Sequence, residues 1–252
     1  MTAASSFAWL TERPIAHRGL HNSSGRVENT IAAFEAAIER NFAIECDVML
    51  CADETVIVFH DSRLDRMTTA TGAVHERTFA ELKSTALRAS NERIPSLNEL
   101  LEVVAGKVPI IVELKSPWPR KTPLARKVAE ALNGYQGHAA VMSFDPRLLM
   151  QMRSYAPHLP RGMVADHFDA EDWPELPAVT RFGSRHMLGT LFVSPSFIAY
   201  NVLSLPAPAP SILRSVFKLP TLAWTVRSAA EHIHALRHAD QIIFEDYDPD
   251  AR

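Results

Sequence analysis

Short apolar segments alternate with helical patterns along the chain, and this alternation constrains the fold more than any other feature. Strands that alternate with helices form βαβ units and a parallel sheet. Apolar residues recur at helical spacing over residues 29–40, 97–104, 124–132, 147–155 and 229–237, which we predict to be helices. The segments predicted as strands are 13–17, 43–50, 55–60, 108–115, 139–144, 162–165, 190–194, 221–227 and 241–245.

Counting residues 55–60 as a hairpin extension of the strand before them leaves eight core strands. Eight strands with helices between them in 252 residues predict a TIM-type (β/α)8 barrel. A doubly wound open sheet is the alternative, although the chain has neither glycine-rich nucleotide-binding motif. We expect one domain over residues 1–252, with a small insertion at about residues 61–95, where a long polar stretch follows the second strand.

The composition excludes several classes of protein. A hydrophobic fraction of 47% excludes a disordered chain, and no apolar run approaches the roughly 18–20 residues that cross a bilayer. The net charge of −3 argues against nucleic-acid binding. Cys46 and Cys51 have neither disulfide-framework nor metal-finger spacing, and no secretory signal is visible, so we expect a cytoplasmic protein.

Carboxylates occupy alternate positions on two neighbouring predicted strands. Glu45 and Asp47 share one face of their strand, and Glu113 shares a face with Lys115, because residues two apart point the same way. Active sites of barrels lie at the carboxyl ends of the strands, so the three carboxylates should converge at one mouth. They would repel one another without a cation, and oxygen ligands select a hard metal. We therefore predict one divalent cation, Mg²⁺ or Ca²⁺, at Glu45, Asp47 and Glu113.

Two histidines end separate strands beside these carboxylates. His17 and His60 are each compatible with a core position, but together they indicate a general acid and a general base. Arg18 and Lys115 would either pair with the carboxylates or hold an anionic substrate. Trp224 would either pack in the core or form a wall of the site.

A series of ordered motifs resembles the glycerophosphodiester phosphodiesterase family and covers nearly the whole chain. The motifs are His17-Arg18-Gly19, Glu28-Asn29-Thr30, Glu45-Cys46-Asp47-Val48, His60-Asp61, Pro95-Ser96-Leu97-Asn98-Glu99, Glu113-Leu114-Lys115, Ser143-Phe144-Asp145 and Trp224-Thr225-Val226. The chain departs from the family pattern at the end of the last strand, where Glu245-Asp246 replaces Thr-Asp. We expect this change to affect the rim and not the metal ligands.

The resemblance implies a TIM-type barrel with an insertion after the second strand. It implies that His17 and His60 form the acid/base pair, and that a divalent metal is held by the three carboxylates. Arg18 and Lys115 would contact the phosphate, and Trp224 would line the substrate site. The substrate would be a small-molecule glycerophosphodiester, cleaved to glycerol 3-phosphate and an alcohol. The sequence does not indicate an oligomeric state.

Two other functions fit the same residues. One is a lysophospholipase D-like or other phosphodiesterase, for which Phe192, Phe197, Ile198 and Tyr200 would supply an apolar surface. The other is a non-catalytic, metal-dependent binding barrel. A proline-rich loop at residues 116–123, which carries Trp118, is a further candidate for substrate choice.

Overall fold

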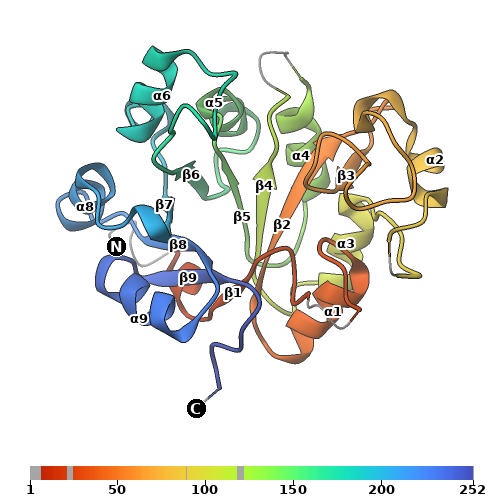
Figure 1. Ribbon diagram of the computed structural model, residues 1–252, viewed down its shortest axis with the longest axis horizontal. Coiled ribbons are helices and arrows are strands. Elements are labelled where there is room, and N and C mark those ends of the chain that lie inside the picture. Colours follow the sequence, from red (N-terminus) through yellow and green to blue (C-terminus); the bar gives the residue numbers. More distant parts are fainter. Residues whose placement is uncertain (1–6, 22–24, 89, 118–121, 252) are drawn as a thin grey trace.

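The centre of the molecule is a closed parallel β-barrel (Figure 1). The computed structural model describes residues 7–21, 25–88, 90–117 and 122–251. Within them the barrel strands are β1 (Ile15–Ala16), β2 (Ala43–Leu50), β4 (Ile110–Leu114), β5 (Ala139–Ser143), β6 (Arg161–Ala165), β7 (Phe197–Asn201), β8 (Thr221–Val226) and β9 (Gln241–Phe244).

The barrel closes because β1 pairs in parallel with both β2 and β9. Strand β3 (Val56–Val58) pairs antiparallel with β2 and lies outside the barrel, as expected for a hairpin extension. The predicted TIM-type barrel is therefore confirmed, and the open-sheet alternative is wrong.

Helices surround the barrel, and side-chain caps fix where several of them begin. They are α1 (Ile31–Glu39), α3 (Leu97–Val104), α4 (Leu124–Leu132), α5 (Pro146–Tyr155), α6 (Ala178–Arg185), α7 (Thr190–Val193), α8 (Pro208–Ser215) and α9 (Ala229–His238). Thr30 caps α1 by accepting from the backbone N–H of Ala33, and Ser96 forms a capping box with Glu99 at the start of α3. None of the described helices is long and apolar enough to cross a bilayer.

Alternation along the strands divides the apolar residues between two layers. Cys46 and Val112 point outward and pack in the large layer between strands and helices. Ile111, from the opposite face of β4, packs inside the barrel. The floor of the barrel is completed by Trp9 and Leu10 of the short helix η2 (Ala8–Thr11), which belong to the same inner cluster.

One predicted strand is wrong. Residues 190–194 form helix α7 and its cap, and the seventh barrel strand is β7, a few residues later. Helical geometry exposes Leu191 and Phe192 and buries Val193, a pattern that a short apolar run does not distinguish from a strand. We expected an apolar surface from Phe192, Phe197, Ile198 and Tyr200. This expectation is wrong for the last three, which are buried in β7.

The segment predicted as an insertion lies beside β3 (Figure 1). It contains the short helices η3 (Val74–Glu76) and α2 (Phe79–Ser84). Its Leu64, Leu82 and Ile94 pack in a small apolar cluster that it shares with Met49 and Ile57 of the β2–β3 hairpin. The assignment of the whole chain to one domain stays a prediction.

Strand β6 comes so close to β7 that Gly162 has no room for a side chain. Gly162 is the register partner of Phe197, and a Cβ atom at this position would overlap the Cε2 and Cζ atoms of the Phe197 ring. We expect Gly162→Ala to lower the free energy of unfolding by about 1–3 kcal/mol, the usual range for an overpacked core. Urea denaturation followed by circular dichroism measures this change.

Gly183 in α6 is the matched control, because an added Cβ there meets no atom within 4 Å. Gly183→Ala should be neutral or stabilise the protein by up to about 1 kcal/mol through helix propensity. Equal effects of the two substitutions would contradict the packing argument.

Candidate active site

Three buried carboxylates meet at the carboxyl ends of β2 and β4. Glu45 and Asp47 come from β2, and Glu113 comes from β4, where it is the register partner of Asp47. One oxygen atom from each lies within 4.8 Å of the other two. The structure thus brings together the three residues that strand parity selected.

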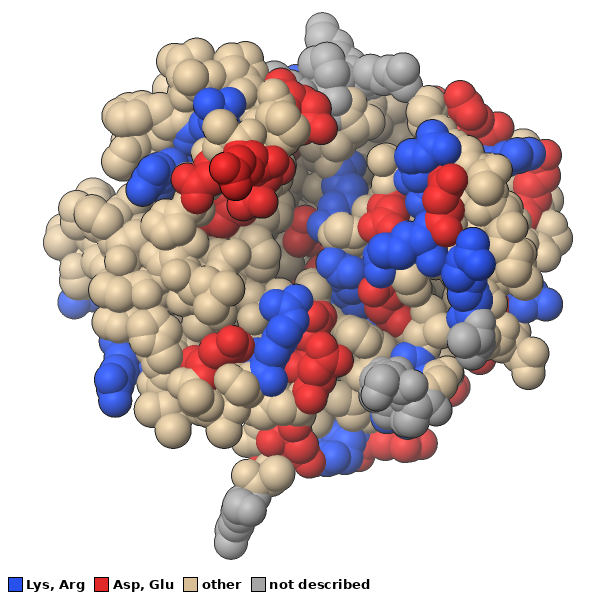
Figure 2. Space-filling view, in the orientation of Figure 1, with Lys and Arg blue, Asp and Glu red and all other residues tan. Residues whose placement is uncertain are grey.

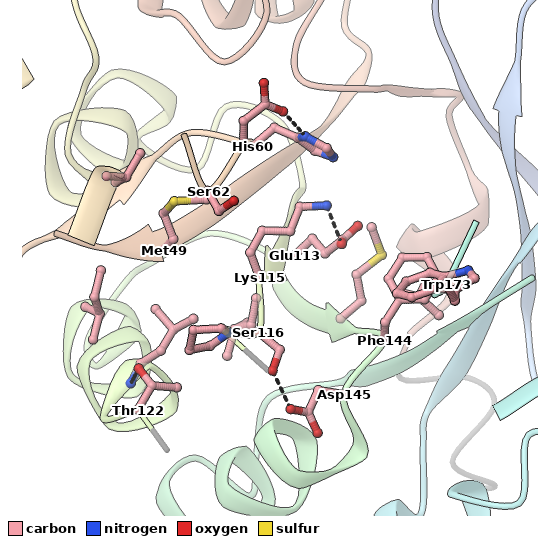
Figure 3. A pocket seen from close by; sticks show the side chains of 18 of the residues that line it. Met49, His60, Ser62, Glu113, Lys115, Ser116, Thr122, Phe144, Asp145 and Trp173 are labelled. Atoms are coloured by element: carbon pink, nitrogen blue, oxygen red, sulfur yellow. Dashed lines mark hydrogen bonds and ion pairs between the residues drawn. The ribbon is translucent and has the colours of Figure 1, made fainter. Parts of the chain in front are cut away.

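Two cationic side chains lie against these carboxylates. Lys115 Nζ is 2.9 Å from Asp47 Oδ1 and 2.6 Å from Glu113 Oε1, and Arg18 Nε is 3.1 Å from Asp47 Oδ2. Figure 3 shows the ammonium group of Lys115 directed at Glu113. The backbone N–H of Arg18 also donates to Glu45 Oε2 at 2.9 Å.

The carboxylates respond differently to this environment. Burial would raise the pKa of Asp47, but the charges of Lys115 and Arg18 hold it well below its usual range. Burial, together with the neighbouring charges of Asp47 and Glu113, raises the pKa of Glu45 well above its usual value. Burial also raises the pKa of Glu113. Lys115 and Arg18 thus stabilise the charged form of Asp47. They do not offset the burial and the neighbouring negative charges that disfavour the charged form of Glu45.

The donor atoms of this cluster fit a hard divalent cation. Among the described residues Glu45 Oε1 is buried and has no hydrogen-bond partner, and Asp47 Oδ1 has no hydrogen bond but lies 2.9 Å from Lys115 Nζ. Buried polar atoms are normally paired, so an oxygen left without a donor suits a cation. The ligand set consists only of oxygen atoms, which matches Mg²⁺ or Ca²⁺ better than softer metals.

Asn29 orients Asp47, a role that the sequence reasoning missed. Its amide Nδ2 donates to Asp47 Oδ2 at 2.9 Å, and its Oδ1 accepts from the backbone N–H of Asp47 at 3.2 Å. Asn29 has φ +58°, a left-handed conformation that asparagine tolerates better than most residues. Its neighbour Thr30 caps α1. The signal was present in the Glu28-Asn29-Thr30 motif, to which the sequence analysis assigned no role at Asp47.

Each of the two predicted histidines is held by a carboxylate at Nδ1. His17 Nδ1 lies 2.5 Å from Glu245 Oε2, and His60 Nδ1 lies 2.7 Å from Asp61 Oδ1. Because a carboxylate only accepts, we assign the proton to Nδ1 in both rings, which leaves each Nε2 unprotonated. Burial lowers the pKa of both histidines, so the neutral rings are favoured. His17 Nε2 lies 3.9 Å from Glu45 Oε2.

Glu245 is the second residue that sequence reasoning missed. The Glu245-Asp246 replacement was expected to affect the rim and not the metal ligands, and the structure adds a direct contact of Glu245 with His17. Arg227 Nη2 is 2.5 Å from Glu245 Oε1, and His21 Nε2 is 3.5 Å from Oε2. Burial would raise the pKa of Glu245, but its hydrogen bonds with the two histidines and the charge of Arg227 hold it well below its usual range.

Asp61 is held in a comparable way by Arg66. Arg66 Nε is 2.6 Å from Asp61 Oδ2, and Arg66 Nη2 is 2.7 Å from Glu28 Oε1, which also accepts from Arg18 Nη1 at 2.8 Å. A chain of ion pairs thus connects His60 to Arg18. Each histidine therefore has a carboxylate partner that is itself fixed by an arginine.

These groups open into one cleft of about 1250 Å³. Figure 2 shows the hollow in the centre of the molecule, with Lys and Arg side chains at its base and along one side. The cleft is lined by His17, Arg18, His60, Glu113, Lys115 and Trp224, six of the eight predicted site residues, while Glu45 and Asp47 lie beneath. Trp118 of the predicted specificity loop lies outside the described residues.

An aromatic cluster forms the wall of the cleft at Trp224. Phe144 is its centre, with ring centroids 5.4 Å from Trp224, 5.2 Å from Trp173 and 6.0 Å from Phe168. The Trp173 and Phe168 rings lie 4.9 Å apart. Trp224 lines the cleft and also packs against the inner apolar cluster, so it has features of both positions considered for it.

The fold and the site define a class, namely TIM barrels with acidic and basic groups at the carboxyl-terminal mouth. The profile of the Glycerophosphoryl diester phosphodiesterase family matches residues 17–247, and the chain belongs to this family. The resemblance seen in the motifs is therefore confirmed.

Relatives with curated names agree with this assignment. The chain is 33% identical over 169 residues to a glycerophosphodiester phosphodiesterase of Caldanaerobacter subterraneus, covering 63% of this chain and 69% of the relative. It is 34% identical over 155 residues to one of Bacillus altitudinis, covering 57% and 62%. The matched stretches thus span about two thirds of these relatives.

A solved structure supports the fold over a longer stretch. The Oleispira antarctica phosphodiesterase in complex with the product sn-glycerol-3-phosphate superposes with a TM-score of 0.77 at 22% identity, covering 97% of this chain and 95% of that one. Glycerophosphodiester phosphodiesterase from Thermotoga maritima gives a TM-score of 0.70 at 25% identity, covering 92% and 94%.

The contact between His17 and Glu245 generates a prediction. Glu245→Ala should lower kcat for a glycerophosphodiester about 10–100-fold, the usual cost of losing a carboxylate that orients a histidine. KM should change little, because Glu245 does not line the cleft. Glu245→Gln keeps an acceptor for His17 and should retain more activity than the alanine variant. Steady-state kinetics on the three proteins measures both effects.

Asp246→Asn is the control, because Asp246 neighbours Glu245 in sequence and does not line the cleft. It should keep the wild-type kcat. A wild-type kcat for Glu245→Ala would show that the contact has no role in positioning His17.

Proposed function

We propose that the protein hydrolyses glycerophosphodiesters to glycerol 3-phosphate and an alcohol, with a divalent cation and with His17 and His60 as general acid and base. The observation that carries this proposal is the placement of both carboxylate-held histidines around one buried carboxylate cluster. Family membership supports the reaction, and the product bound by the Oleispira relative is the phosphate ester that the proposal predicts.

Glu45, Asp47 and Glu113 would hold the cation, Mg²⁺ or Ca²⁺. When bound, it supplies positive charge for the non-bridging oxygens of the phosphodiester, where negative charge develops in the transition state. Arg18 and Lys115 would add fixed positive charge at the same oxygens. Both are oriented by the carboxylates, because Arg18 pairs with Asp47 and Glu28, and Lys115 pairs with Asp47 and Glu113.

The two imidazoles would move the protons of the reaction. One accepts the proton of the nucleophile, which is either water or the neighbouring glycerol hydroxyl. The other must start as the imidazolium, with Nε2 also protonated, and donates that proton to the leaving alkoxide. Since both Nδ1 atoms are engaged by carboxylates, Nε2 is the atom of each ring that exchanges these protons. Trp224 would form the wall against which the substrate packs.

The alternative function, a non-catalytic binding barrel, explains fewer features of the site than the proposed enzyme does. Binding a metal requires only the three carboxylates, whereas both histidines are held in one tautomer by carboxylates that are paired with Arg227 and Arg66. The proposal includes a small-molecule partner, one domain and a cytoplasmic location. The location is supported by Cys46 and Cys51, which are buried free thiols.

The metal site is tested by Asp47→Asn, which removes a charge and keeps the shape of the side chain. We expect most of the activity to be lost and divalent-cation binding to weaken, because Asp47 is one of three proposed ligands. Isothermal titration with Mg²⁺ and Ca²⁺ measures binding, and circular dichroism verifies the fold. A chelator should abolish the wild-type activity, and either cation should restore it.

Asp250→Asn is the matched control, because Asp250 pairs with Arg13 at the surface. It should bind metal and turn over substrate like the wild type. The assignment of Asp47 is wrong if Asp47→Asn binds the cation as tightly as the parent and stays active.

The acid/base pair is tested by replacing each histidine with alanine. His17→Ala and His60→Ala should each lower turnover by about 10²–10⁴-fold, the usual contribution of one acid or base. The double variant should lose less than the product of the two effects, because both groups act in one reaction. Release of glycerol 3-phosphate from glycerophosphocholine measures all three.

His75 is a suitable control, since it lines the same cleft but lies on the insertion. His75→Ala should cost much less than either of the other two. A near wild-type rate for His17→Ala would return that residue to a structural role.

A further inference from the structure

Three side chains meet at the Nδ1 edge of the His17 ring. His17 Nδ1 lies 2.5 Å from Glu245 Oε2, and His21 Nε2 lies 3.5 Å from the same oxygen. One ligand atom from each of these residues lies within 4.8 Å of the other two. The other nitrogen of the ring, His17 Nε2, lies 3.9 Å from Glu45 Oε2. The group of His17, His21 and Glu245 and the three-carboxylate cluster are therefore served by different nitrogens of one ring.

His21 has no part in the mechanism proposed above, and its Nε2 atom is short of partners. The atom is buried and, among the described residues, makes no hydrogen bond of normal length, because 3.5 Å is long for a bond from nitrogen to oxygen. Buried polar atoms are normally paired, so a nitrogen that faces a carboxylate at this distance needs an explanation.

The turn after β1 holds His21 in this position. Residues 17–20 form the turn, and the backbone N–H of Leu20 donates to the carbonyl of Ala33 at 2.8 Å. Gly19 has φ +77°, and a Cβ atom added to it would lie 2.9 Å from the carbonyl carbon of Ala33. The two histidines thus belong to a closed turn packed against α1. A ligand that binds between them meets side chains that are already ordered, which lowers the entropic cost of binding.

The donor atoms of this group differ from those of the carboxylate cluster. Two imidazole nitrogens and one carboxylate oxygen are a ligand set that binds Zn²⁺ in proteins, with a fourth position left open. Imidazole suits Zn²⁺, whereas sites made only of oxygen suit Mg²⁺ and Ca²⁺. Ligands about 2.1 Å from a tetrahedral ion lie about 3.4 Å apart. The separation of His21 Nε2 from Glu245 Oε2 is already close to this value.

We propose that His17, His21 and Glu245 form a second cation site, selective for Zn²⁺ over Mg²⁺, and that an ion bound there inhibits the enzyme. Arg227 pairs with the other oxygen of Glu245, so Oε2 stays directed at the two rings. The inhibition rests on the proposed catalytic role of His17, whereas the binding of the ion does not.

Inhibition follows from the proton balance of the His17 ring. In the free protein Nδ1 carries the proton and Nε2 keeps its lone pair. An ion that binds Nδ1 displaces this proton, and the ring regains one from the solvent at Nε2, so the ring stays neutral. The coordinated ring then has no lone pair with which to accept a proton, and it cannot become the imidazolium. It can serve neither as the base nor as the acid.

Isothermal titration of the full chain with Zn²⁺ tests the site. Excess Mg²⁺ is present throughout to occupy the carboxylate cluster. We expect the wild type to bind one Zn²⁺ that Mg²⁺ does not displace. His21→Ala should weaken this binding about 100-fold or more, because it removes a direct ligand and the loss of an outer partner already costs about 10–100-fold. Co²⁺, whose visible absorption reports its ligands, should show the same loss.

Glu245→Gln is a second variant that separates loss of a ligand from loss of the fold. It removes the charge that attracts the ion and keeps an acceptor for His17. It should bind Zn²⁺ as weakly as His21→Ala does, and circular dichroism verifies the fold of both variants. Wild-type affinity in a folded Glu245→Gln protein would contradict the ligand assignment.

Turnover of glycerophosphocholine with Mg²⁺ measures the inhibition. Zn²⁺ should inhibit the wild type over the concentration range in which it binds. In His21→Ala the half-inhibiting concentration should rise by the same factor as the dissociation constant, relative to the rate of that variant without Zn²⁺.

His238→Ala is the matched control, because His234 and His238 form another close pair of rings, with centroids 5.1 Å apart on α9. It should bind Zn²⁺ and be inhibited like the wild type. If His238→Ala loses the bound ion and His21→Ala keeps it, the ion binds at α9 and the proposed site is wrong.

Other outcomes separate this inference from the proposed function. Equal Zn²⁺ affinity in the wild type and in His21→Ala would overturn the site. Tight binding without inhibition would overturn the inference and leave the hydrolysis of glycerophosphodiesters intact. A protein that does not turn over glycerophosphocholine under any condition would remove the proposed function and the inhibition with it, whereas the titrations would still decide whether Zn²⁺ binds at His21.

Discussion

The charge balance around Asp47 is the constraint on which the rest of the site depends. A carboxylate that is fully buried needs charged or hydrogen-bonding partners, and Asp47 has Lys115, Arg18 and Asn29. These partners come from three different segments of the chain. Buried ion pairs do not by themselves prove that a fold is stabilised, because desolvation offsets much of the Coulomb attraction. Here they fix the relative positions of the segments.

The segment before α1 is held in place by the same network. Arg18 has φ +55° and Asn29 has φ +58°, a left-handed conformation that is uncommon for arginine and better tolerated by asparagine. The backbone N–H of Asn29 donates to the carbonyl of Arg18 at 3.0 Å, and the backbone N–H of Arg18 reaches Glu45. Strained backbone of this kind persists where surrounding contacts determine it, and here the contacts are those of the carboxylate cluster.

Strand parity and motif order were sufficient to predict most of this arrangement. Because residues two apart share a face, Glu45 and Asp47 had to point into the mouth if Cys46 packed outward, and Cys46 is buried against the helices. Alternation of strands and helices predicted the barrel, since few other folds use eight parallel strands in a chain of this length. These inferences need only local geometry, which a single sequence contains.

Contacts between distant segments could not be predicted in the same way. Glu245 lies 228 residues from His17, and the two meet only because β1 pairs with β9 when the barrel closes. The prediction of a strand at residues 190–194 was wrong for a different reason. The side chains of this segment fit both a strand and a helix, and only the packing of Val193, with Leu191 exposed, selects the helix.

The two histidines consequently depend on different parts of the fold. The carboxylate that holds His60 belongs to the adjacent residue Asp61, which pairs with Arg66 of the insertion. Arg66 also pairs with Glu28, so the orientation of His60 depends on how the insertion packs against the loop that carries Glu28. The carboxylate of His17 is supplied by the chain that follows β9, so its orientation depends on barrel closure. Loosening the insertion should therefore disturb one imidazole and spare the other. The barrel places the two imidazoles, for which we propose the proton transfers, on separate supports around one carboxylate cluster, and this separation allows each to be adjusted by changes in its own support.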